Sequence, residues 1–263
     1  METIVQILAR ELGRKEAHVQ NVVTLLDEGN TIPFIARYRK EMHGTMDDTT
    51  LRTLADRLTY LRSLDKRREE VKASIEGQGK LTEALSAAID AAATLAEVED
   101  LYRPYKPKRR TRATIAREKG LEPLAQLLFA QGRDCPAPET AAADYVNPEK
   151  GVNSVEEALA GASDIIAEAV SDDANLRKRL RELWRSKGSL VSRAADKEPE
   201  DTVYRLYYDF TTPVSRAMGH QILAINRGER EGVLKVSVEM DREPPLILVP
   251  RAVLAPGAPS MSF

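Results

Sequence analysis

The stretch that begins at Asp47 repeats apolar side chains every three or four residues, a spacing that a β-strand cannot bury on one face. Its members are Leu51, Leu54, Leu58, Leu61, Leu64, Val71 and Ile75. On a helix they form one apolar stripe, while the charged run KRREE falls in exposed turns. The pattern predicts one long helix against which shorter helices pack.

Two shorter patterns precede this helix. Ile4, Ile7, Leu8 and Leu12 stop at Gly13, and Val19, Val22, Val23 and Leu26 stop at Gly29. Glycine is a natural helix exit, so the two patterns predict a helix-turn-helix-like element. We favour an ordinary helical hairpin over a DNA-reading unit, because the second helix offers few groups that could read base edges: His18, Gln20 and Asn21.

A third short helix is predicted after Thr31, with Pro33 in its first turn. Phe34, Ile35 and Tyr38 form its apolar stripe. The basic residues near its end, which are Arg37, Arg39 and Lys40, are explained by the favourable interaction of cations with a helix C-terminus.

The whole chain predicts a mainly α fold with a small C-terminal α/β piece. We expect a helical domain at 1–132 that includes the helix-turn-helix-like element, and a linker at 133–151, where three prolines occur. A second helical segment follows at 152–241, in which SLVSRA, VYRLYYDF and VLKVSVEM favour strands and GHQILAINRGEREG a helix. The proline-rich stretch 242–263 predicts an irregular tail.

The strongest local signal is a basic segment at residues 103–119. It holds eight lysines and arginines and one glutamate, a net charge of +7 in a chain whose total is −2. Pro104 and Pro107 disfavour a regular helix at its start, so an extended loop that displays its charges is expected. Such a segment indicates an anionic partner, and phosphate is the natural candidate.

Two interpretations of the basic segment stay open. In the first, its cations contact a phosphate backbone, and Tyr102 and Tyr105 stack on unpaired bases. The second makes it an internal clamp on carboxylates of the same protein, for instance near Glu97, Glu99 and Asp100. The candidate nucleic-acid-binding residues are Arg103, Tyr105, Lys106, Lys108, Arg109, Arg110, Arg112 and Arg117.

Catalytic patterns are scarce in the sequence. The histidines His18, His43 and His220 are far apart and lack metal-ligand spacing, and no phosphate-binding loop or nucleophile elbow occurs. We therefore expect no enzyme, metal or cofactor, and a nuclease is the least favoured class. The single cysteine, Cys135, the lack of a secretory signal and the lack of a long apolar span predict a cytoplasmic protein without membrane contact.

Three segments carry a family resemblance: GNTIPFIARYRKE at Gly29–Glu41, EDLYRPYKPKRRTRATIAREKGLEPLA at Glu99–Ala125, and RGEREGVLKV at Arg227–Val236. They closely resemble the N-terminal region of the bacterial Tex family of RNA-binding transcriptional accessory proteins. The resemblance covers about residues 1–241. It implies an elongated helical scaffold with a helix-turn-helix element, and we expect the chain to be truncated before the family's YqgF domain.

The function we expect is that of a non-catalytic transcription accessory module. It would bind the phosphate backbone of RNA or DNA, with RNA the expected partner, and with little sequence preference. In the alternative it is a protein-interaction scaffold that contacts RNA polymerase or other transcription machinery, with the basic segment as a clamp on itself or on its partner.

Overall fold

The computed structural model describes residues 2–132, 135–196 and 202–254. These residues are mainly helical, with one small antiparallel sheet, so the predicted fold class is confirmed. The chain divides into two compact units, unit 1 at Met1–Tyr105 and unit 2 at Lys106–Phe263. Among the described residues, no helix combines the length and the apolar character needed to cross a membrane.

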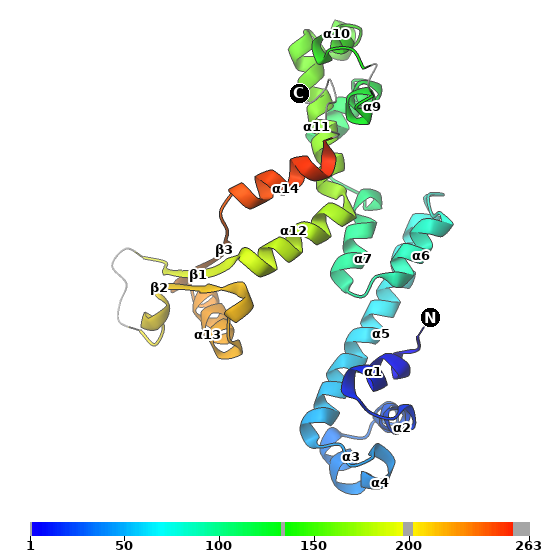
Figure 1. The fold of residues 1–263 in the computed structure, drawn as a ribbon, viewed down its shortest axis with the longest axis vertical. Coiled ribbons are helices and arrows are strands. Elements are labelled where there is room, and N and C mark those ends of the chain that lie inside the picture. Colours follow the sequence, from blue (N-terminus) through cyan, green and yellow to red (C-terminus); the bar gives the residue numbers. More distant parts are fainter. Residues whose placement is uncertain (1, 133–134, 197–201, 255–263) are drawn as a thin grey trace. The chain divides into compact units, whose positions relative to one another are not determined.

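Among the described residues of unit 1, all the regular elements are helices (Figure 1). Its longest element is α5, and the α1–α2 hairpin packs against it. The bounds are α1 Ile4–Leu12, α2 Glu16–Asp27, α3 Ile32–Tyr38, α4 Lys40–His43, α5 Asp48–Glu76, α6 Glu83–Ala91 and α7 Leu95–Tyr102, followed by the 3₁₀ turn η1 at Arg103–Tyr105.

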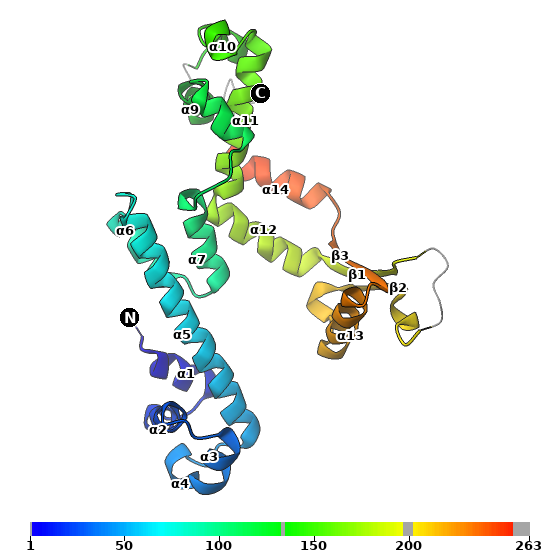
Figure 2. The ribbon, with the colours of Figure 1, turned by 180° about the vertical axis from the view of Figure 1, so that it is seen from behind.

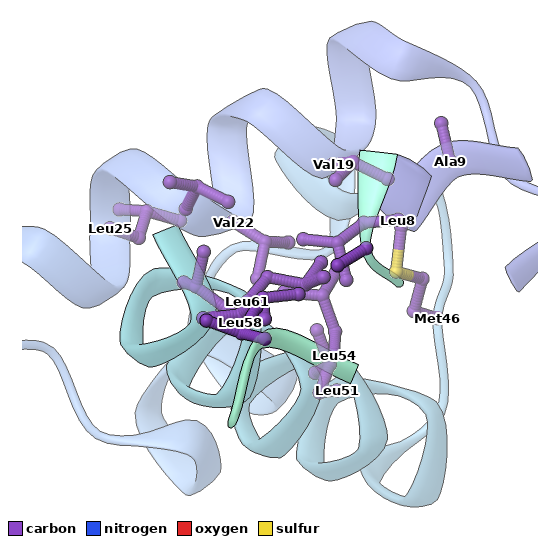
Figure 3. Packing of buried hydrophobic residues seen from close by; sticks show 14 of the residues in the cluster. Leu8, Ala9, Val19, Val22, Leu25, Met46, Leu51, Leu54, Leu58 and Leu61 are labelled. Atoms are coloured by element: carbon purple, nitrogen blue, oxygen red, sulfur yellow. The ribbon is translucent and has the colours of Figure 1, made fainter. Parts of the chain in front are cut away.

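The predicted spine is α5. Asp47 caps its N-terminus by accepting a hydrogen bond from the Thr50 N–H at 2.7 Å. All seven apolar residues of the predicted stripe are buried, and Figure 3 shows several of them meeting side chains of α1 and α2. Burying a leucine contributes about 1.5–3 kcal/mol, so this stripe accounts for much of the stability of unit 1.

Unit 2 contains a helical part and a sheet part. The helices are α8 Arg112–Glu118, α9 Glu122–Ala130, α10 Pro138–Ala143, α11 Val155–Asp172, α12 Ala174–Lys187, α13 Gly219–Arg230 and α14 Glu243–Val253. The strands are β1 Ser189–Ala194, β2 Asp209–Pro213 and β3 Leu234–Glu239, and the 3₁₀ turns are η2 Pro148–Lys150, η3 Arg205–Tyr207 and η4 Val214–Arg216.

The three strands form one antiparallel sheet in the order β2-β1-β3, and α13 packs against β3 (Figure 2). The predictions of β1, β3 and α13 are confirmed. The strand expected in VYRLYYDF lies later than predicted, because Tyr204 is buried and the Tyr207 carbonyl accepts a hydrogen bond from Ser192 Oγ at 2.8 Å. These contacts hold residues 205–207 as η3, and β2 starts only at Asp209.

Two stretches differ from their expected character. The expected linker at 133–151 contains the short helix α10, and Ala141 and Ala142 are buried in the core of unit 2. The tail expected to be irregular forms α14 up to Val253, because Pro244 and Pro245 occupy a first turn that needs no N–H from them. Residues 133–134 and 255–263 lie outside the described part, and the domain limits expected from the sequence remain a proposal.

The helical core of unit 2 depends on small side chains where α11 crosses α8 and α9. A Cβ atom added at Gly161 would lie 2.3 Å from Cδ1 of Leu121 and 3.4 Å from Cβ of Ala116. Leu121 is 1% exposed, so it has little room to move away. Glycine at this position therefore permits the close approach of the helices.

Replacing Gly161 by valine should destabilise unit 2 by about 2 kcal/mol, because the extra methyl groups overpack the crossing. The control is Ala160→Val, which places the same side chain on the exposed neighbouring position of α11 and costs only a few tenths of a kcal/mol in helix propensity. Urea unfolding measures both variants. Equal midpoints for the two would show that the crossing tolerates the added volume.

Candidate nucleic-acid interface

The basic segment is less extended than its prolines predict. Arg103–Tyr105 form the 3₁₀ turn η1 at the end of unit 1, residues 106–111 are irregular, and α8 begins at Arg112 in unit 2. Thr111 caps α8 by accepting a hydrogen bond from the Thr114 N–H at 3.1 Å. Most cations of the segment therefore lie in an irregular stretch and the first turn after it.

Lys108 is held by carboxylates of its own unit. Its Nζ forms an ion pair with Asp172 and lies 3.4 Å from Oε1 of Glu168. The side chains of Asp172 and Glu168 are only 9% and 15% exposed. Lys108 therefore helps to neutralise the charge that α11 buries.

Glu168 is the centre of this contact. Its Oε2 accepts a hydrogen bond from Arg117 Nη1 at 2.7 Å, and its Oε1 accepts one from Thr111 Oγ1 at 3.1 Å. Arg117 Nε also lies 3.5 Å from Glu122. One carboxylate thus ties the irregular stretch and α8 to α11.

Three acidic residues form a row on α11 that was not predicted from the sequence. Asp164, Glu168 and Asp172 are spaced by four residues, so they share one face of the helix, and Asp164 lies 3.6 Å from Arg112 Nε. We call the three residues the acidic stripe. Their regular spacing of four residues is the signal by which the sequence could have revealed them.

Two of the acids named above as possible clamp partners accept hydrogen bonds within unit 1. Glu99 accepts a hydrogen bond from Arg67 of α5 at 2.6 Å, and Glu97 accepts one from the Ala93 N–H at 2.7 Å. Asp100 is buried in α7. The suggestion of a clamp is supported for Lys108 and Arg117, whose carboxylate partners are the acids of α11 and, for Arg117, also Glu122 of α9.

Other cations of the segment face solvent. Lys106 and Arg109 are exposed, and neither forms an ion pair within the described part of the chain. The Arg112 side chain is 88% exposed despite its distant contact with Asp164, and the Arg110 side chain is 67% exposed and pairs with Glu118, whose side chain is 53% exposed. We call Lys106, Arg109, Arg110 and Arg112 the outward group.

The two tyrosines expected to stack on bases differ in exposure. Tyr102 is buried, with its hydroxyl 2.9 Å from Ser74 Oγ and the Arg67 guanidinium 5.5 Å from its ring centroid, so that prediction is wrong. Tyr105 is half-buried against the core of unit 1. Arg103 is exposed in the same turn.

The helix-turn-helix-like element uses its polar groups internally. Asn21 Nδ2 donates a hydrogen bond to the Met42 carbonyl at 3.0 Å, and the Gln20 side chain is 3.4 Å from that of Thr24 in the same helix. The His18 ring lies against Gly44. These contacts favour the helical hairpin over a unit that reads base edges.

The described residues offer no group of three or more His, Cys, Asp or Glu side chains placed to hold a metal ion. The chemistry that the acidic stripe performs is ion pairing. Burial raises the pKa of the Glu168 carboxyl, but the hydrogen bond from Arg117, the charge of Lys108 and the hydroxyl of Thr111 outweigh burial, so the pKa is lower than its ordinary value of 4.5.

This lowered pKa predicts a pH-dependent contribution to stability. A carboxyl with a depressed folded-state pKa stabilises fully above its unfolded value of 4.5, and the contribution is lost as the pH falls through the folded-state pKa. At neutral pH we expect the Glu168→Gln variant to be less stable than the wild type by about 2 kcal/mol. In urea unfolding followed down to about pH 3, the difference should shrink steadily. A difference that stays constant would show that ionised Glu168 is not the stabilising group.

Two family models match the sequence. One, described as the Tex-like protein N-terminal domain, matches residues 2–76, and the other, described as Tex central region-like, matches residues 134–252. The first covers α1 to α5 and the second runs from α10 to α14. The basic segment lies between the two matches.

Curated relatives align over most of the chain. The "Protein tex" of Bordetella pertussis is 47% identical over 242 residues, 91% of this chain and 30% of the relative. The "Transcriptional accessory protein Tex" of Neisseria gonorrhoeae is 44% identical over 238 residues, 90% of this chain and 31% of the relative. The human "S1 RNA-binding domain-containing protein 1" is 31% identical over 246 residues, 90% of this chain and 24% of the relative. The chain thus spans a third or less of the length of these relatives.

Proposed function

The chain belongs to the Tex family, and from that premise we propose that it is a non-catalytic nucleic-acid-binding module of a transcription accessory protein in the cytoplasm. It binds RNA or DNA by the phosphate backbone, with little sequence preference. The names of its relatives support the general role, since one is called a transcriptional accessory protein and another an RNA-binding domain-containing protein.

The observation that carries the binding proposal is the division of the basic segment into two sets of cations. Lys108 and Arg117 are held on the acidic stripe, whereas the outward group has its charges in solvent. The held cations position the segment on α11 and the outward group contacts phosphate. Arg103 and Tyr105 lie in unit 1 and do not enter this proposal.

Phosphate contacts make affinity depend on salt, because each one releases counterions from the nucleic acid. For a single strand the slope of log K against log salt is about −0.7 per contact, so the outward group predicts a slope of about −3. The test is a salt titration of fluorescence anisotropy with labelled single-stranded RNA and duplex DNA. Binding that is absent at low salt, or that does not respond to salt, would contradict the proposal.

A second candidate function, a scaffold for protein partners such as RNA polymerase, is favoured by a separate observation. Apolar side chains near the sheet of unit 2 lie in solvent: Val203 is 86% exposed, Leu206 82% and Leu223 73%. Exposed apolar side chains of this size favour protein contacts. Undetectable binding of both nucleic acids at low salt would favour this candidate over the first.

A further inference from the structure

The aromatic side chains of α3 are not buried together as the sequence predicts. Ile35 is fully buried, but Tyr38 is 57% exposed. The Phe34 and Tyr38 ring centroids are 5.2 Å apart at an interplanar angle of 45°. The Phe34 ring therefore packs against the Tyr38 ring, and the Tyr38 ring remains accessible to solvent.

Three basic residues lie close to this ring pair along the chain. The Arg39 guanidinium lies 5.3 Å from the Phe34 ring centroid, and its Nη1 donates to the Tyr38 carbonyl at 3.3 Å. Arg37 and Lys40 are exposed and form no ion pair with any residue for which the structure gives a position. Both lie within two residues of Tyr38, at most about 7 Å along the backbone. We call Phe34, Arg37, Tyr38, Arg39 and Lys40 the α3–α4 surface.

Two hydrogen bonds, one buried and one partly buried, hold the backbone that follows this surface in the chain. Asn21 of α2 donates to the Met42 carbonyl at 3.0 Å, and the Met46 N–H donates to Nδ1 of His43 at 3.0 Å. His43 is 1% exposed, so this anchor lies in the core. A ligand on the α3–α4 surface would therefore meet backbone that is already ordered, which lowers the entropic cost of binding.

An exposed aromatic ring, with cations that form no ion pair one and two residues away along the chain, suits one class of ligand. Aromatic side chains stack on the faces of unpaired bases, and neighbouring lysines and arginines contact the phosphates. A protein partner of neutral surface would leave the cations without counter-charges, whereas a nucleic-acid strand supplies bases and phosphates together. A duplex hides its base faces, so stacking selects single strands.

We propose that the α3–α4 surface binds single-stranded nucleic acid, with an unpaired base stacked on Tyr38 and phosphates on Arg37 and Lys40. This site is distinct from the outward group, because all of its residues lie in unit 1. It adds to phosphate binding a preference for unpaired over paired strands.

The experiment compares Tyr38→Ala with the control Tyr38→Phe, which keeps the ring and removes only the hydroxyl. The probe is labelled oligouridine of about ten nucleotides, and affinity is measured by anisotropy at low salt. We expect Tyr38→Ala to weaken single-strand binding about tenfold, Tyr38→Phe to change it little, and neither to change the affinity for a duplex. Circular dichroism confirms that both variants fold.

Equal affinity of Tyr38→Ala and wild type for oligouridine would overturn the proposal, as would undetectable binding of oligouridine by the wild type. Photocrosslinking with iodouridine gives a second readout, because a stacked base should crosslink to the peptide that contains Tyr38, and a crosslink confined to other peptides would count against it. Failure of the proposed phosphate binding by the outward group would give a different result. In that case charge reversal at Lys106 and Arg109 would leave the affinity for a duplex unchanged.

Discussion

Replacing Lys108 by glutamate is expected to destabilise unit 2 by about 3 kcal/mol. The new carboxylate would lie beside Glu168 and Asp172, whose side chains are 15% and 9% exposed. Three carboxylates in one poorly solvated place repel one another, and Asp172 would lose its ion pair with Lys108. Because the Lys108 side chain is 29% exposed, water screens part of this effect, and the estimate lies at the low end for a broken buried ion pair.

Urea unfolding followed by tryptophan fluorescence measures this effect in the relevant unit, since Trp184 is the single tryptophan and lies in α12. The matched control is Lys106→Glu, the same substitution two residues away at an exposed position without an ion pair among the described residues. It should change the free energy of unfolding by less than about 0.5 kcal/mol. Equal losses for the two variants would mean that the acidic stripe does not hold Lys108.

Reversing two charges of the outward group, Lys106→Glu with Arg109→Glu, is expected to weaken single-strand binding about 50-fold at about 50 mM salt. Each lost phosphate contact removes about 0.7 from the salt slope, so the slope should fall from about −3 to about −1.5. Neither residue pairs with another described residue, so the folded state should keep its stability. Anisotropy measured over a salt series gives the affinity and the slope together.

The control for this pair is Lys187→Glu with Arg185→Glu, two exposed cations near the end of α12. It changes the net charge of the chain by the same amount, and therefore removes the effect of overall charge from the comparison. If both double variants lose the same affinity, phosphate binding depends on the whole charge of the protein. The outward group would then have no special part in it.

Local patterns in the sequence predicted most of the helices because burial and chain geometry act over short distances. The leucines of α5 and the glycine exit of α1 are examples, and the same holds for the strands β1 and β3. A tertiary contact can shift such a pattern: η3 replaces the start of a predicted strand because Tyr204 is buried and Ser192 bonds the Tyr207 carbonyl. The prolines in the first turn of α14 likewise predicted an irregular tail, whereas the structure has a helix there.

The candidate site could be predicted only in part. Net charge identified the basic segment, but it could not separate Lys108 from Lys106, because the carboxylates that hold Lys108 lie 60 or more positions later on α11. The exposure of Tyr38 was equally hidden, since an aromatic residue at helical spacing indicates burial when only the sequence is known. Both distinctions depend on which residues meet in three dimensions.

The division of the basic segment into held and outward cations is tested most directly by lysine acylation. Cleavage after Glu99 and Glu118 yields a peptide, 100–118, in which Lys106 and Lys108 are the two lysines. Mass spectrometry of this peptide compares their labelling rates in the folded protein. Lys108 should react about tenfold more slowly than Lys106, the factor expected if its ion pair is worth about 1.4 kcal/mol. Equal rates, or faster labelling of Lys108, would contradict the account.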